Sequence, residues 1–102
     1  RGLEKGRYEL MLCEPDRCTP RRIAEIGARG PIDWTPDGRS LLVSDRQDSG
    51  SPYAIMSVEV ASGARKRLTD PPRGTHGDHT PKLSPDGQRL AFVRSANLTV
   101  QD

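Results

Sequence analysis

The stretch Trp34–Arg46 reads WTPDGRSLLVSDR, and Leu83–Ser95 repeats its pattern as LSPDGQRLAFVRS. In each copy the proline fixes φ at about −65°, and the glycine accepts the positive φ that closes a hairpin with a bulge. The hydroxyl of the Thr or Ser before the proline can accept a hydrogen bond from the backbone of the turn. The repeat therefore predicts two hairpins, with six structural turn residues: Pro36, Asp37, Gly38, Pro85, Asp86 and Gly87.

Alternating apolar and polar residues predict short strands on both sides of these turns. Leu41 and Val43 in the first copy correspond to Leu90 and Phe92 in the second. Pro and Gly interrupt every window long enough for a helix, so we expect strands throughout. The predicted strands are Tyr8–Glu14, Arg21–Ile26, Pro31–Thr35, Ser40–Asp45, Ala54–Val60, Lys66–Thr69, Pro81–Ser84, Arg89–Arg94 and a start at Leu98–Gln101.

A second repeat indicates the length of the repeating unit. Tyr8–Pro15 (YELMLCEP) resembles Tyr53–Val60 (YAIMSVEV), and each is followed by a turn and a basic strand. About nine short strands, in units of roughly 45 residues with four strands each, are typical of β-propeller blades. The predicted fold class is therefore all-β, with antiparallel four-stranded blades. Residues 8–26 are expected to form half a blade, residues 30–69 a full blade, and residues 78–102 half of another.

The composition narrows the classes of function. Hydrophobic residues make up 32% of the 102 residues, and the net charge is only +2. The densest basic run, Ala64–Leu68, has no interleaved aromatic residues, so we expect no nucleic-acid binding through this segment. No apolar run approaches the roughly 20 residues that span a bilayer, so no membrane contact by this segment is expected. The chain starts at Arg1 and stops in an alternating run, which indicates a fragment of a longer protein.

These motifs resemble the PD40/WD40-like repeats of TolB-like six-bladed β-propellers. The resemblance rests on the two PDG turns, on the strand Ser40–Asp45, and on the run IMSVEVASGARKRLT at Ile55–Thr69. The sequence of the repeats is most similar to the C-terminal propellers of bacterial membrane-anchored winged-helix transcriptional regulators. It departs from the family pattern at Leu83, where a tryptophan is usual, and in the first copy, which lacks a counterpart of Asp78.

The resemblance implies a non-catalytic protein-interaction or sensory module with a protein or peptide partner and no cofactor. It implies a periplasmic or otherwise extracytoplasmic location in a bacterium. Related repeats also form the propeller cap of prolyl-oligopeptidase-type serine peptidases and the TolB-type component of the periplasmic Tol–Pal system. Both of these stay as alternatives.

A propeller blade packs both faces on its neighbours, so a piece of about two blades would leave apolar faces exposed. We therefore expect self-association. Three copies would close a six-bladed ring, with Leu98–Gln101 of one copy completing the blade that Tyr8–Glu14 of the next begins.

The longest predicted loop carries the sequence HGDH, which supplies His76, Asp78 and His79. This loop leads into the first strand of a blade, the strand nearest a propeller's axis. We therefore expect these residues at the mouth of the channel, where they would contact a ligand or peptide. Two histidines and a carboxylate can also hold a metal ion. A polar, Gly-rich loop is nevertheless an ordinary place for such residues, so no metal is expected.

Cys13 and Cys18 lie on either side of an expected strand-to-strand turn. Neighbouring strands of a hairpin come within disulfide range, so a bridge is allowed in an oxidising compartment. Two reduced, partly buried thiols are the alternative, and the sequence leaves both open.

The chain is not expected to be an enzyme. It contains no Gly-x-Ser-x-Gly motif, no Gly-rich phosphate loop and no HExxH motif. Asp37 and Asp86 are explained by the turns and do not form a catalytic pair. Arg46 and Arg94, at strand ends, are expected to face the solvent and to have no role.

Overall fold

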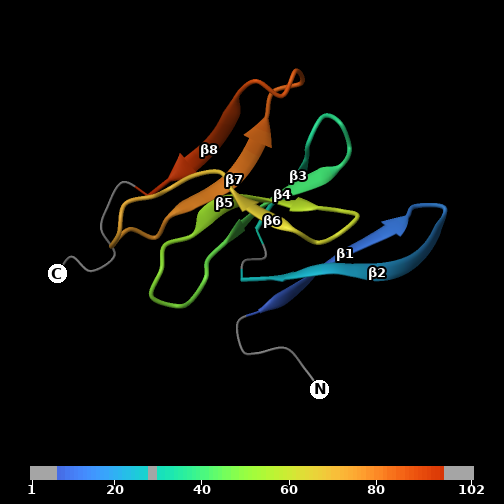
Figure 1. Ribbon diagram of the computed structural model, residues 1–102, viewed down its shortest axis with the longest axis horizontal. Coiled ribbons are helices and arrows are strands. Elements are labelled where there is room, and N and C mark those ends of the chain that lie inside the picture. Colours follow the sequence, from blue (N-terminus) through green and yellow to red (C-terminus); the bar gives the residue numbers. More distant parts are fainter. Residues whose placement is uncertain (1–6, 28–29, 96–102) are drawn as a thin grey trace.

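The computed structural model describes residues 7–27 and 30–95 (Figure 1). This part of the chain forms eight β-strands and no helix, and thus has no helix that could cross a membrane. The all-β prediction is confirmed. The strands are β1 (Tyr8–Glu14), β2 (Arg17–Ile26), β3 (Asp33–Trp34), β4 (Ser40–Asp45), β5 (Ala54–Glu59), β6 (Arg65–Arg67), β7 (Asp78–Leu83) and β8 (Leu90–Arg94). The predicted strand Leu98–Gln101 lies outside the described residues.

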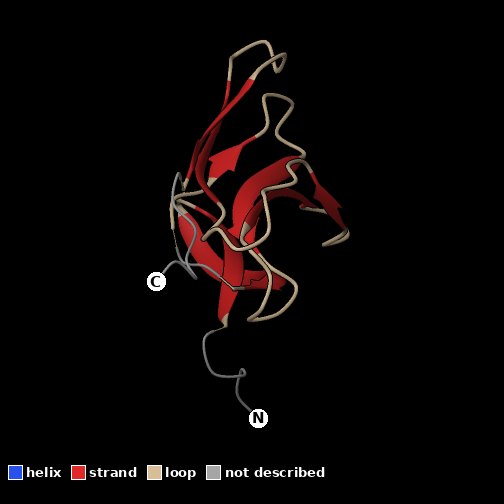
Figure 2. Ribbon diagram, turned by 90° about the vertical axis from the view of Figure 1, so that its left-hand side faces the viewer, coloured by secondary structure: helices blue, strands red, loops and turns tan. Residues whose placement is uncertain are grey.

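The strands pair into three antiparallel sheets, β1–β2, β3–β4–β5–β6 and β7–β8. Strands that follow one another in the sequence are neighbours in each sheet. The β1–β2 hairpin lies on one side of the four-stranded sheet and the β7–β8 hairpin on the other (Figure 1), and β4 contacts both β2 and β7. Figure 2 shows the described residues as strands joined by loops and turns. Packed antiparallel meanders of this kind are consistent with a fragment of a β-propeller.

The core is built around β4, which is buried on both faces. Leu41 and Val43 join Leu10 and Ile26 of the β1–β2 hairpin in one hydrophobic cluster. Leu42 is placed on the opposite face by the alternation of a strand, and it is fully buried as well. Burying one such side chain contributes roughly 1.5–3 kcal/mol. A strand with apolar residues on both faces is therefore stable only between two other sheets.

The two PDG turns fold alike, as the sequence predicts. Gly38 and Gly87 both have a φ of 73°, and each donates its N–H over 2.9 Å to the carbonyl oxygen of the Thr or Ser three residues earlier. The hydroxyl oxygens of Thr35 and Ser84 each accept the N–H of the residue five positions further on, at 3.1 Å.

The aspartate of each turn is held by the turn itself. Asp37 accepts the hydroxyl of Thr35 and a backbone N–H, and Asp86 does the same in the second copy. The hydroxyl bond, followed by the backbone bond, lowers the pKa of each exposed carboxyl below its ordinary value. Both carboxylates therefore have local partners that account for their presence.

Six strands differ from their predicted bounds, and two of them differ by a single residue: β5 ends at Glu59 and β8 begins at Leu90. β2 begins at Arg17 because a two-residue turn at Pro15 and Asp16 closes the hairpin early. The strands β3 and β6 are shorter than predicted, with two and three residues.

The strand β7 begins at Asp78 and not at Pro81. Proline cannot donate to a ladder, so it normally marks an edge or a bulge. Here the register shifts between His79 and Lys82, and Thr80 adopts a φ of 52°. The bulge accommodates the proline and lets the strand continue through it.

Candidate functional site

His76 and His79 form a hydrogen-bonded chain where β4 meets the start of β7. Nδ1 of His76 lies 2.9 Å from Nε2 of His79, and Nδ1 of His79 lies 3.2 Å from Oγ of Ser44. The Ser44 hydroxyl donates to the carbonyl oxygen of Asp78 at 2.7 Å. Of the three residues that the sequence groups here, the structure thus brings the two imidazoles into direct contact.

The row of hydrogen bonds from His76 through His79 to Ser44 has one donor-to-acceptor direction, because the carbonyl oxygen of Asp78 at its end can only accept. The Ser44 proton is committed to Asp78, so Nδ1 of His79 donates to the serine oxygen. Burial, and then the neighbouring His76, lower the pKa of His79 below its ordinary value of 6.5. His79 is therefore neutral at pH 7, and its Nε2 accepts from Nδ1 of His76. The exposed end of the chain is Nε2 of His76.

Tyr53 joins the histidine loop to the start of β5. Its N–H donates to the carbonyl oxygen of His76 at 3.1 Å, and its carbonyl oxygen accepts the N–H of Asp78 at 2.8 Å. These bonds form a parallel bridge between Tyr53 and Gly77. Gly77 has a φ of 111°, and a Cβ at this position would collide with the Tyr53 backbone. The Tyr53 ring centroid lies 5.5 and 5.1 Å from those of the two imidazoles.

A cleft of about 360 Å³ opens beside the exposed ring of His76. The guanidinium of Arg46, a residue expected to face the solvent, lies at the edge of this cleft, 4.5 Å from the Tyr53 ring centroid. Hydroxyl, guanidinium and imidazole groups suit the polar groups of a peptide. The lining residues are Arg46, Ser49, Gly50, Ser51, Pro52, Gly74, Thr75 and His76. The described residues hold no group of three metal-ligating side chains.

Asp78 does not line this cleft, because it is fully buried. Nε and Nη2 of Arg94 donate to its two carboxylate oxygens at 2.7 and 3.0 Å. Burial acts to raise the pKa of Asp78, but the hydrogen bonds from Arg94 and Thr69 outweigh burial, so this pKa lies below its ordinary value. The prediction that Arg94 has no role is therefore wrong. The sequence does not show that the two ends of one hairpin carry a matched ion pair.

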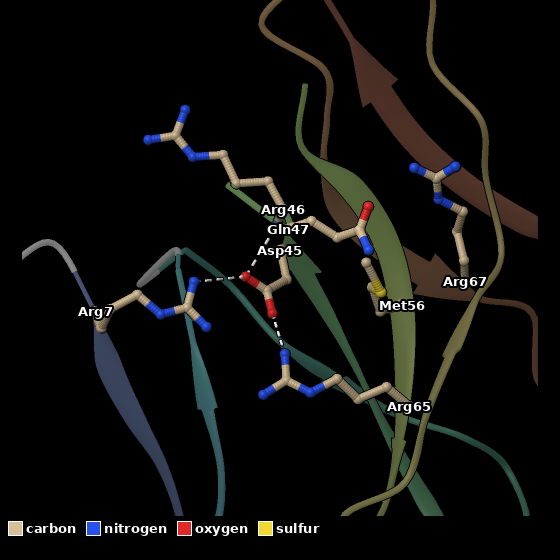
Figure 3. A pocket seen from close by; sticks show the side chains of 7 residues that line it. All are labelled: Arg7, Asp45, Arg46, Gln47, Met56, Arg65 and Arg67. Atoms are coloured by element: carbon tan, nitrogen blue, oxygen red, sulfur yellow. Dashed lines mark hydrogen bonds and ion pairs between the residues drawn. The ribbon is translucent and has the colours of Figure 1, made fainter. Parts of the chain in front are cut away.

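A second polar cluster surrounds Asp45 (Figure 3), a residue that sequence reasoning did not single out. Its buried carboxylate accepts the N–H groups of Gly27 and Arg46 at 2.7 and 2.8 Å. It also pairs with the guanidinium groups of Arg7 and Arg65. Gly27, Arg7 and Arg65 come from three different segments, so no local pattern could have grouped them with Asp45. A charged residue closing the apolar run LLVSD was the only available signal.

Cys13 and Cys18 are joined by a disulfide, with Cα atoms 4.9 Å apart. The bridge closes the tip of the β1–β2 hairpin. Cys13 and Cys18 do not line the cleft beside His76.

Comparison with known proteins gives two partial similarities, and no protein-family model matches the chain. The chain is 41% identical over 63 residues to a Bacillus subtilis protein named uncharacterized peptidase YuxL; the match covers 61% of this chain and 9% of that protein. It is 29% identical over 97 residues to the Tol-Pal system protein TolB of Francisella tularensis, which covers 92% of this chain and 21% of that protein. The chain therefore spans at most about a fifth of the length of these two curated relatives. Both similarities are consistent with a TolB-like propeller fragment.

Proposed function

We propose that the chain is part of a non-catalytic β-propeller that binds a protein or peptide partner. The observation that carries the proposal is the cleft beside His76, whose walls come from the loops after β4 and before β7. Binding residues are often placed on loops that a rigid scaffold positions, and here the scaffold is the sheet core around β4. A peptide would meet Arg46, the loop serines and the exposed Nε2 of His76 in this cleft.

The whole propeller would have six blades, and its location would be periplasmic or extracytoplasmic. The similarity to a Tol-Pal system protein supports this location. The disulfide between Cys13 and Cys18 suits an oxidising compartment. Within this proposal the parent protein is a bacterial membrane-anchored regulator whose propeller senses a partner, or a TolB-type component of the Tol–Pal system.

A second candidate function is the propeller of a serine peptidase. The similarity to a protein named as a peptidase supports it, because it has the higher identity of the two matches. In this case the propeller would control access to a catalytic site carried by another domain, and the cleft beside His76 would contact the entering peptide.

A peptide selection tests the binding role. The full chain is immobilised and used to enrich peptides from a random display library, and each enriched peptide is then titrated against variants. We expect His76→Ala and Arg46→Ala to weaken binding at least tenfold, and the matched control Arg89→Ala to leave it unchanged. Peptides that bind all three variants equally, or no enrichment at all, would contradict the proposal.

The coding sequence on either side of this chain separates the two candidates. A winged helix with one membrane span identifies the regulator, and an α/β-hydrolase domain identifies the peptidase. If neither domain is encoded, the Tol–Pal component is the remaining candidate. Hydrolysis of a selected peptide by the purified chain itself would contradict the non-catalytic assignment.

A further inference from the structure

A pocket of about 530 Å³ lies between the β1–β2 hairpin and the four-stranded sheet, around the Asp45 cluster (Figure 3). Four of the seven residues that line it are arginines: Arg7, Arg46, Arg65 and Arg67. Asp45 is the only acidic residue among the seven. The other two are Gln47, which is exposed, and Met56, which is half-buried.

The charge of this lining is not balanced. Asp45 carries one negative charge and already accepts hydrogen bonds from two backbone N–H groups and two guanidinium groups. Arg67 pairs with Asp70 at 3.2 Å, but the Asp70 side chain is 89% exposed. Solvent screens such a pair, so it holds Arg67 only weakly. The pocket therefore keeps an excess of positive charge.

Two of the guanidinium groups are fixed in position. Arg7 and Arg65 both donate to the Asp45 carboxylate, and both also donate to the carbonyl oxygen of Glu25. A guanidinium has five N–H donors. The bonds to Asp45 and Glu25 use two of these five donors on each arginine. Figure 3 shows Arg7 and Arg65 on different sides of Asp45, with the amide of Gln47 and the thioether of Met56 between Asp45 and Arg67.

We propose that this pocket binds an oxyanion, a carboxylate or a phosphate group, of a small molecule or a single side chain. A guanidinium matches both groups with two parallel hydrogen bonds. The volume lies within the range of small-molecule sites, roughly 300–1,000 Å³. Met56 offers an apolar contact for a short carbon stem of the ligand. Arg67 gives up its ion pair with the exposed Asp70 and binds the ligand instead.

This inference is independent of the proposed peptide cleft beside His76. The two sites share only Arg46. In Figure 3 the guanidinium of Arg46 points away from Asp45, and it lies over the Tyr53 ring at the edge of the other cleft. The oxyanion is thus assigned to Arg7, Arg65 and Arg67, with Gln47 as an additional donor.

Anion titrations of the full chain test the proposal. Inorganic phosphate and glutarate are added separately at constant ionic strength, with chloride as the reference anion, and binding is followed by calorimetry and by the NMR signals of the arginine Nε–H groups. We expect saturable binding of at least one of the two anions, with shifts of the Arg65 and Arg67 signals and none at Arg89. Tighter binding of phosphate assigns a phosphate ligand, and tighter binding of glutarate assigns a carboxylate.

Substitution of Arg67 provides the matched comparison. Arg67→Gln is expected to weaken anion binding about tenfold, which corresponds to about 1.4 kcal/mol, and Arg89→Gln removes the same charge on an exposed turn and should have no effect. The NMR signals of the unmodified chain keep the test valid if Arg67→Gln does not fold. Binding that does not saturate, or an equal loss in both variants, would overturn the proposal.

Discussion

Arg94 balances the charge of Asp78, a carboxylate with no exposed surface. Removing one partner of a buried pair leaves an uncompensated charge, which costs roughly 3–5 kcal/mol. Arg94→Ala should cost less than this, because the arginine side chain is 39% exposed. Urea unfolding measures the loss. Arg89→Ala, on an exposed turn, should stay within about 0.5 kcal/mol, and equal midpoints for the two variants would contradict the prediction.

His79 should make the stability of the chain depend on pH near neutrality. Its pKa is lower in the folded chain than the ordinary value of 6.5, so the unfolded chain binds more protons between the two values. The part of the folding free energy that depends on neutral His79 is therefore present above pH 6.5, and it is lost as the pH drops below that value. Urea midpoints at pH 7.5 and at pH 5.5 should show this loss, and His79→Gln should remove most of it. A midpoint that rises toward acid would contradict the prediction.

At the scale of elements, the parallel bridge between Tyr53 and Gly77 ties the four-stranded sheet to the β7–β8 hairpin. Gly77→Ala would place a Cβ against the Tyr53 backbone at a φ of 111°. Strain of this kind costs roughly 1–3 kcal/mol, and the amide of Asp78 should then exchange faster with deuterium. Gly30→Ala is the control, because nothing lies within 4 Å of a Cβ there. Equal exchange in the two variants would contradict the role of the bridge.

The disulfide should contribute modestly to the β1–β2 hairpin. It closes a short loop, with a sequence separation of five, and the chain-entropy estimate for such a loop is about 2 kcal/mol. The double variant Cys13→Ser/Cys18→Ser should lose about this amount in urea unfolding. Alkylation of the unfolded chain without reductant should leave its mass unchanged, and a mass gain would show free thiols instead.

How far the sequence predicts these elements depends on how local their determinants are. The turn at Gly38 and the strand β4 follow from neighbouring residues, and both were predictable. The start of β7 was not, because a bulge at Thr80 rescues a proline that should have ended the ladder. Asp45 was missed for a different reason, since Arg7 and Arg65 lie far from it in the sequence and meet it only when the sheets pack.

At the scale of the whole molecule, the two outer hairpins are two-stranded sheets, so among the described residues each of their strands has one edge without a strand neighbour. Within the described ranges β1 pairs only with β2, and β8 pairs only with β7, and Val93 on β8 is 63% exposed. Such edges and faces favour association. We expect light scattering to show a trimer with three times the 11.2 kDa mass of the chain, in line with a closed six-bladed ring.

A charge on the open face should interfere with this assembly. Val93→Lys is expected to shift the trimer toward monomer, because packing the lysine against a second copy would bury an unpaired charge. Arg89→Lys serves as the matched control and should keep the mass of the parent chain. A monomer for the unmodified chain at micromolar concentration would contradict self-association.

Asp45 and Arg94 stand at the same position of the thirteen-residue repeat, yet they carry opposite charges. Each is matched to its own surroundings: Asp45 to two arginines, Arg94 to one buried carboxylate. If the two copies were exchanged, a guanidinium would sit between Arg7 and Arg65, and a carboxylate would face Asp78. The copies share their turns but are not interchangeable modules, so like-charge repulsion fixes the order in which they can follow one another along the chain.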